Sequence, residues 1–78
     1  MSYLLPTKHS HPDRTTIAVA TLILQRLKNV RVEQYDDLIA YGMNKNKDTE
    51  YLFLGAVNFL FLLGVVVYHS KTDSFEYI

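Results

Sequence analysis

The chain contains no cysteine, and its eight basic residues are balanced by eight acidic ones. Without cysteine there is no disulfide and no thiolate metal site, which suits a reducing compartment. A dedicated nucleic-acid binder usually carries a positive excess, because phosphate contacts dominate its affinity. The zero charge balance therefore counts against that function. The three glycines are isolated from one another, so the sequence has no phosphate-binding loop.

The start of the sequence lacks the charged and apolar regions of a signal peptide, since residues 1–5 read Met-Ser-Tyr-Leu-Leu. We therefore expect a cytoplasmic protein.

Apolar residues, in contrast, are plentiful and make up 49% of the 78 residues. A chain of this length forms one domain, whose core contributes on the order of 3–5 kcal/mol of net stability. The apolar share is more than such a core comfortably hides, and an excess of this kind often marks an interface. The composition thus predicts a small subunit of a larger assembly.

The pattern along the chain predicts three helices and a β-hairpin. An extended N-terminal arm is expected over residues 1–11, because Pro6 and Pro12 disfavour a helical conformation in the residues before them. Residues 12–78 are predicted to form a small winged-helix-like domain of the α+β class, with the hairpin as its wing. The expected elements are a helix over Pro12–Asn29, a short strand at Val30–Val32 that bridges to a later strand, helices over Glu33–Met43 and Asp48–Leu63, and strands at Val65–Tyr68 and Ser74–Ile78.

The residue types at the predicted boundaries explain these positions. Asn29 tolerates the left-handed conformation that ends a helix, and Gly64 stops the third helix. Glu33 is expected in the first turn of the second helix, where negative charge complements the helix dipole. Gly42 weakens the end of that helix, and Asp48 is a suitable N-cap for the third.

The third helix occupies the position that reads the major groove in DNA-binding winged helices, yet it carries no basic residue, and its only amide is Asn58. It is therefore unsuited to base readout. Leu54 and Phe61 share the side of Asn58, and we interpret them as partner-docking residues, although the wing and first helix could also cover both faces. The predicted core stripe of this helix is Leu52, Ala56, Phe59, Leu60 and Leu63, with Phe53 and Leu62 between the faces.

A transmembrane alternative arises from the uncharged run Tyr51–Tyr68. Asn58 and Gly64 interrupt this run, its end favours a strand, and no cluster of Lys and Arg flanks it. A small single-span membrane protein therefore ranks below the winged helix.

The residues that could carry catalysis or metal binding are explained more simply as solvated surface residues. His9, His11 and His69 have no carboxylate partner at a suitable spacing, so we predict no metal site, and we predict no catalytic residue and no cofactor.

The runner-up hypothesis is a winged-helix DNA-binding or transcription-regulatory protein. It rests on three possible contacts to a DNA backbone, Lys45, Lys47 and Lys71, and requires the loop and the wing to be adjacent.

The N-terminal segment Leu4–His9, followed by Pro12-Asp13-Arg14 and an apolar helix, resembles the Middle Component 6 family of bacterial ABC-three-component systems. The later pattern of Ala56, Phe59-Leu60-Phe61 and Leu63-Gly64 before a hairpin is similar to that family too.

The resemblance implies a non-catalytic adaptor subunit that lies between an ATPase of the structural-maintenance (SMC) or Rad50 type and an effector, often a nuclease. The adaptor is implied to bridge or regulate that effector, holding it in check until foreign DNA is sensed. Such complexes are implied to act in Lamassu-like defence against phages and plasmids, with DNA reached through the complex. An apolar pair beside a proline in an extended segment suits docking along a groove or sheet edge. The residues expected to contact a partner there are Leu4, Leu5, Pro6, Thr7, Lys8 and His9.

Overall fold

A computed structural model describes residues 14–78, so the predicted arm over residues 1–11 lies outside the described residues. The described part follows the order helix, strand, helix, helix, hairpin, which confirms the α+β class and the winged-helix-like arrangement. The elements are α1 (Arg14–Val30), β1 (Val32–Gln34), α2 (Tyr35–Lys45), α3 (Thr49–Leu63), β2 (Val66–His69) and β3 (Ser74–Tyr77).

The three strands form one antiparallel sheet with β3 at its centre. On one side β3 pairs with β2, where Phe75 lies opposite Tyr68, and on the other it pairs with β1, where Phe75 lies opposite Glu33. The expected bridge between the first strand and a later one is therefore confirmed. The strand itself covers Val32–Gln34 instead of Val30–Val32.

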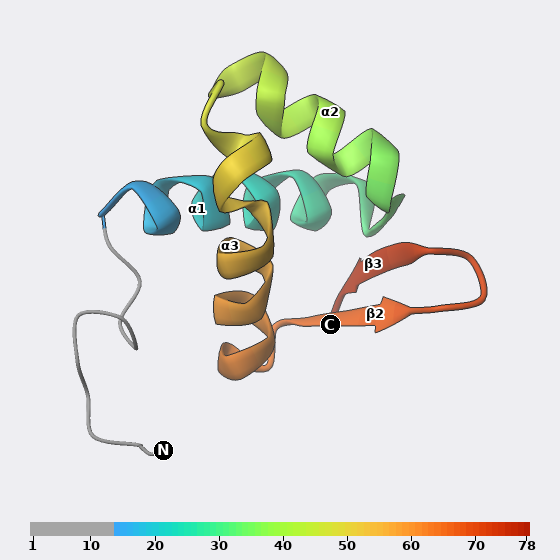
Figure 1. The fold of residues 1–78 in the computed structure, drawn as a ribbon. Helices are drawn as coiled ribbons and strands as arrows, with labels where there is room; N and C mark the ends of the chain where they lie inside the picture. Colours follow the sequence, from blue (N-terminus) through green and yellow to red (C-terminus); the bar gives the residue numbers. More distant parts are fainter. Residues whose placement is uncertain (1–13) are drawn as a thin grey trace.

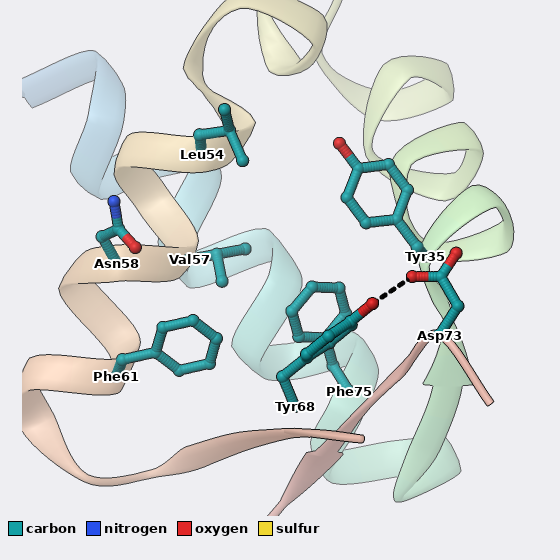
Figure 2. A pocket seen from close by; sticks show the side chains of 8 residues that line it. All are labelled: Tyr35, Leu54, Val57, Asn58, Phe61, Tyr68, Asp73 and Phe75. Carbon is teal, nitrogen blue, oxygen red and sulfur yellow. Dashed lines mark hydrogen bonds between the residues drawn. The ribbon is translucent and has the colours of Figure 1, made fainter. Parts of the chain in front are cut away.

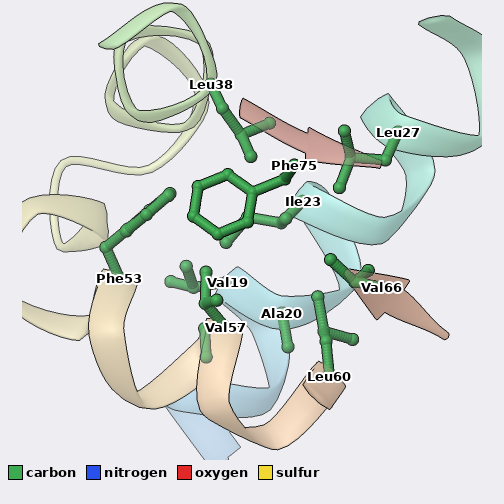
Figure 3. Packing of buried hydrophobic residues seen from close by; sticks show 11 residues of the cluster. Val19, Ala20, Ile23, Leu27, Leu38, Phe53, Val57, Leu60, Val66 and Phe75 are labelled. Carbon is green, nitrogen blue, oxygen red and sulfur yellow. The ribbon is translucent and has the colours of Figure 1, made fainter. Parts of the chain in front are cut away.

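Figure 1 shows α2 above α1, α3 crossing α1 and leading into β2, and the hairpin projecting to one side as a wing. All three helices and the hairpin contribute to one core (Figure 3). The buried apolar residues are Val19, Ala20, Ile23, Leu27, Leu38, Phe53, Ala56, Val57, Leu60, Val66 and Phe75.

The C-terminal ends of the first two helices differ from the predicted positions. α1 continues past Asn29 to Val30, and the left-handed residue that follows it is Arg31, with φ of 76°. The carbonyl oxygen of Arg31 accepts a hydrogen bond from the Tyr77 amide at 2.9 Å, so pairing with the hairpin fixes the chain direction here. α2 continues beyond Gly42 to Lys45, and that glycine is buried inside the helix.

Glu33 does not lie in the second helix, because it belongs to β1. Its carboxylate accepts two hydrogen bonds of 2.8 Å from the guanidinium of Arg26 on α1. The same guanidinium lies 4.7 Å from the centre of the Tyr41 ring on α2. The interaction with Glu33 raises the pKa of Arg26, mainly through the side-chain hydrogen bond. Arg26 thus ties β1 and α2 to α1 with a planar group that matches both partners.

The buried face of α3 is also rotated relative to the predicted stripe. Ala56 and Leu60 are buried as expected, but Leu63 is 57% exposed. Leu52 and Phe59 are half-buried and pack against the core. Phe53 and Val57 take the remaining core positions. The helix ends as predicted at Gly64, which has φ of 74°. Asp48 precedes α3 as expected, although its side chain makes no capping hydrogen bond.

Candidate functional site

The outward side of α3 presents apolar side chains. Leu54 is 67% exposed, Tyr51 is 85% exposed and Leu62 is 86% exposed, and no residue of α3 is basic. In a DNA-reading winged helix this side would carry donors for base edges and phosphates. The structure thus leaves an apolar helix face where a DNA-binding domain has a polar one.

Part of this face forms one wall of a groove between α3 and the hairpin (Figure 2). The groove has a volume of about 230 Å³. Small-molecule sites usually occupy roughly 300–1,000 Å³, so the groove suits a few side chains of a partner better than a whole ligand. Its lining residues are Tyr35, Leu54, Val57, Asn58, Phe61, Tyr68, Asp73 and Phe75.

Aromatic rings join the groove to the core. The Phe75 ring on β3 lies with its centre 5.1 Å from that of Tyr68 and 6.1 Å from that of Phe61. The centre of the Phe75 ring also lies 6.0 Å from the ring centre of Tyr35 and 6.0 Å from that of Phe53. Such aromatic pairs contribute about 0.5–1.5 kcal/mol beyond their buried area. The floor of the groove is therefore a packed and ordered surface.

The hairpin rim of the groove holds a polar pair. The Tyr68 hydroxyl donates a hydrogen bond to Oδ1 of Asp73 at 2.5 Å. This hydrogen bond, with burial as a smaller cause, raises the pKa of Tyr68 above its ordinary value. The backbone oxygen of Asp73 accepts a hydrogen bond from the Tyr35 amide at 2.8 Å, which links the hairpin to the start of α2. Asp73 is thus held through both its side chain and its backbone.

Two of the sequence-predicted partner residues, Leu54 and Phe61, lie together in this groove. The others, Leu4 to His9, lie outside the described residues. The hairpin residues Tyr68 and Asp73 were not predicted as part of any site. The only signal for them was the expected position of a wing beside the third helix.

The three lysines proposed as DNA-backbone contacts are not brought together. Lys45 ends α2 and Lys47 follows it, whereas Lys71 lies in the turn between β2 and β3. Figure 1 places the loop between α2 and α3 and the tip of the hairpin at different ends of the molecule. The adjacency that a shared basic patch requires is therefore absent for these residues.

Other candidate chemistry gains no support from the described residues. His69 lies on the hairpin with Nε2 at 2.7 Å from Oε1 of Glu76, which places it in a surface ion pair when protonated. Residues 14–78 contain no group of three His, Asp or Glu side chains that could hold a metal ion. Among the same residues no helix has the length and apolar character needed to cross a membrane, and α3 itself has 15 residues.

Comparison with known families adds independent information. A family model described as ABC-three component (ABC-3C) system Middle Component 8 matches residues 31–78. These residues are more than half of the chain and include α2, α3 and all three strands, so they contain every residue of the groove. Neither the curated proteins nor the solved structures give a match.

The match confirms the expected class, a middle component of an ABC-three-component system. It does not support Middle Component 6 as the particular family. The segment Leu4–His9, which carried most of that resemblance, precedes the matched residues.

Proposed function

The chain belongs to the Middle Component 8 family of ABC-three component systems, and on this premise we propose that it is a non-catalytic adaptor subunit that docks on its partners through the groove between α3 and the hairpin. The partners in this proposal are an SMC- or Rad50-like ATPase and an effector of a defence complex. The subunit holds the effector in position and reaches DNA through the complex.

One observation carries the proposal. The exposed Leu54 and the partly exposed Phe61 line a single groove on the helix face that would otherwise read DNA. Exposed apolar side chains around a concave centre are typical of residues that dominate binding energy at protein interfaces. The absence of basic residues on α3 argues against a nucleic acid as the direct ligand of this face.

Co-purification of the tagged subunit with the ATPase and effector encoded beside it tests the proposal. We expect Leu54→Ser to weaken the complex by at least about 2 kcal/mol, or roughly 30-fold in Kd, as for the removal of a central interface anchor. Leu62→Ser is the matched control, since Leu62 is equally apolar, more exposed, on the same helix and outside the groove lining. It should leave the Kd within about two-fold.

Equal effects of the two substitutions would show that the groove is not the docking site. A wild-type subunit that stays alone when co-expressed with these neighbours would refute the adaptor role itself. Thermal melting of both variants checks that each remains folded.

The N-terminal segment Leu4–His9 is proposed as a second contact to the partners, because its apolar pair and proline suit docking in an extended conformation. Deletion of residues 1–11 should release one partner while the helical circular dichroism signal is retained. If both partners remain bound after the deletion, the assembly depends on the groove alone.

A further inference from the structure

The groove has an apolar wall and a single charged residue on its rim. Asp73 is the only one of the lining residues with a formal charge. The ion pairs among residues 14–78 join Arg26 to Glu33 and His69 to Glu76, and neither involves Asp73. Within the described part of the chain, this carboxylate has a hydroxyl partner, Tyr68, but no cation.

Asp73 is also held in a fixed position. Its backbone has φ of 51°, a left-handed conformation that Asp and Asn adopt more readily than most residues. The Tyr68 hydroxyl binds one carboxylate oxygen, and the backbone oxygen binds the amide of Tyr35. Figure 2 shows Asp73 on the rim that faces α3 across the groove. The charge is therefore presented in advance of binding, which lowers the entropic cost of using it.

The opposite wall accepts apolar side chains over a defined length. Leu54 and Phe61 are separated by two turns of α3, which corresponds to about 10 Å along the helix axis. Asp73 lines the same groove as these two residues, so we expect a partner segment that fills the groove to cover the rim as well. Covering a carboxylate without a compensating charge is costly, because the ion loses water and gains no partner.

From this arrangement we infer the chemistry of the occupant. We propose that the groove receives a segment of the ATPase subunit that carries apolar side chains and one lysine or arginine, and that this basic side chain pairs with the Asp73 carboxylate. The inference rests on the proposed adaptor function and adds the recognition chemistry to it. The apolar side chains supply contact area, whereas the ion pair fixes the register of the segment.

The substitution Asp73→Asn removes the charge and changes little else. Asparagine tolerates the same left-handed backbone and keeps an oxygen that accepts the Tyr68 hydroxyl. We expect the full-length variant to bind the purified ATPase subunit at least about 10-fold more weakly than wild type. Its Kd should also depend less on sodium chloride, because the screened ion pair is gone.

Two further variants separate the possible causes. Tyr68→Phe removes the hydrogen bond within the rim but keeps the charge, so its Kd should retain the salt dependence of wild type. Leu54→Ser reports on the apolar wall independently. If Leu54→Ser weakens binding and Asp73→Asn does not, the ion pair is refuted and the docking site stands. If neither weakens binding, the docking site is refuted as well.

Other occupants give different results, and each would overturn the inference. If the chain's own segment with Leu4, Leu5 and Lys8 filled the groove, Asp73→Asn would tighten binding to the ATPase by releasing a competitor. If a second copy of the chain filled it, light scattering of the isolated subunit would show a dimer that Asp73→Asn dissociates.

Discussion

Gly42 of α2 lies directly against Thr49, the first residue of α3. A Cβ atom on Gly42 would stand 2.6 Å from Cγ2 of Thr49, closer than side-chain atoms approach one another. Thr49 is fully buried, so its side chain cannot turn toward solvent to make room. The absence of a side chain at Gly42 is therefore what allows α2 and α3 to meet at this corner.

Gly42→Ala should lower the free energy of unfolding by about 1–3 kcal/mol, because the added methyl group overpacks the contact. Urea denaturation of the purified subunit measures this change. Gly55→Ala is the matched control, since Gly55 is also helical but its Cβ would lie 3.7 Å from the nearest atom, Cγ2 of Thr16. There the gain in helix propensity, up to about 1 kcal/mol, should appear as increased stability. Destabilisation of similar size in both variants would contradict the contact.

Thr49 itself offers a stabilising substitution. Its hydroxyl oxygen is buried without a hydrogen-bond partner, so folding removes it from water uncompensated. Thr49→Val keeps the branched shape and replaces that hydroxyl with a methyl group. We expect it to raise the free energy of unfolding by about 1 kcal/mol. A loss of stability in the same denaturation experiment would mean that the hydroxyl is bonded in solution.

Phe53 and Leu54 are adjacent in sequence but have opposite surroundings. Phe53 is 1% exposed and Leu54 is 67% exposed. Phe53→Ala should cost about 3–5 kcal/mol, comparable to the whole stability of a domain this small, and should leave much of the protein unfolded at room temperature. Leu54→Ala should change stability by less than about 0.5 kcal/mol. Circular dichroism and thermal melting of the two variants distinguish these outcomes.

The pair Phe53 and Leu54 also shows where sequence reasoning reached its limit. The predicted stripe on the third helix was only partly right, because that helix is apolar on nearly all sides and its periodicity does not select one face. The buried face is chosen by contacts from distant elements. The Phe53 ring lies 5.1 Å from Tyr35 and 6.0 Å from Phe75, measured between ring centres.

Features with local causes were predicted more closely. Gly64 ends α3 as expected, since its left-handed backbone suits glycine. The end of α1 was misplaced, because Arg31 adopts a left-handed conformation under the constraint of sheet pairing with Tyr77. In the candidate site, Leu54 and Phe61 followed from helical spacing. Tyr68 and Asp73 join them only through the position of the hairpin, which no local pattern encodes.

The hydrogen bond between Tyr68 and Asp73 predicts a pH dependence at the alkaline end. Because the pKa of Tyr68 is raised in the folded state, the protonated phenol stabilises the fold fully below its unfolded pKa of about 10. That contribution to stability is lost as the pH rises through the pKa that Tyr68 has in the folded state. Between those values, wild type should lose stability more steeply than Tyr68→Phe in urea denaturation. Parallel curves for the two proteins would exclude the contribution.

The central place of β3 in the sheet has a consequence for biosynthesis. β3 follows both of its neighbours in the chain, so β1 and β2 have no strand to pair with until the ribosome has released Ser74–Tyr77. Phe75, which forms the floor of the groove, arrives with the same strand. A nascent chain that stops short of β3 would have neither the sheet nor the groove. Under the proposed docking role, recruitment through this surface would require a chain in which β3 has already left the ribosome.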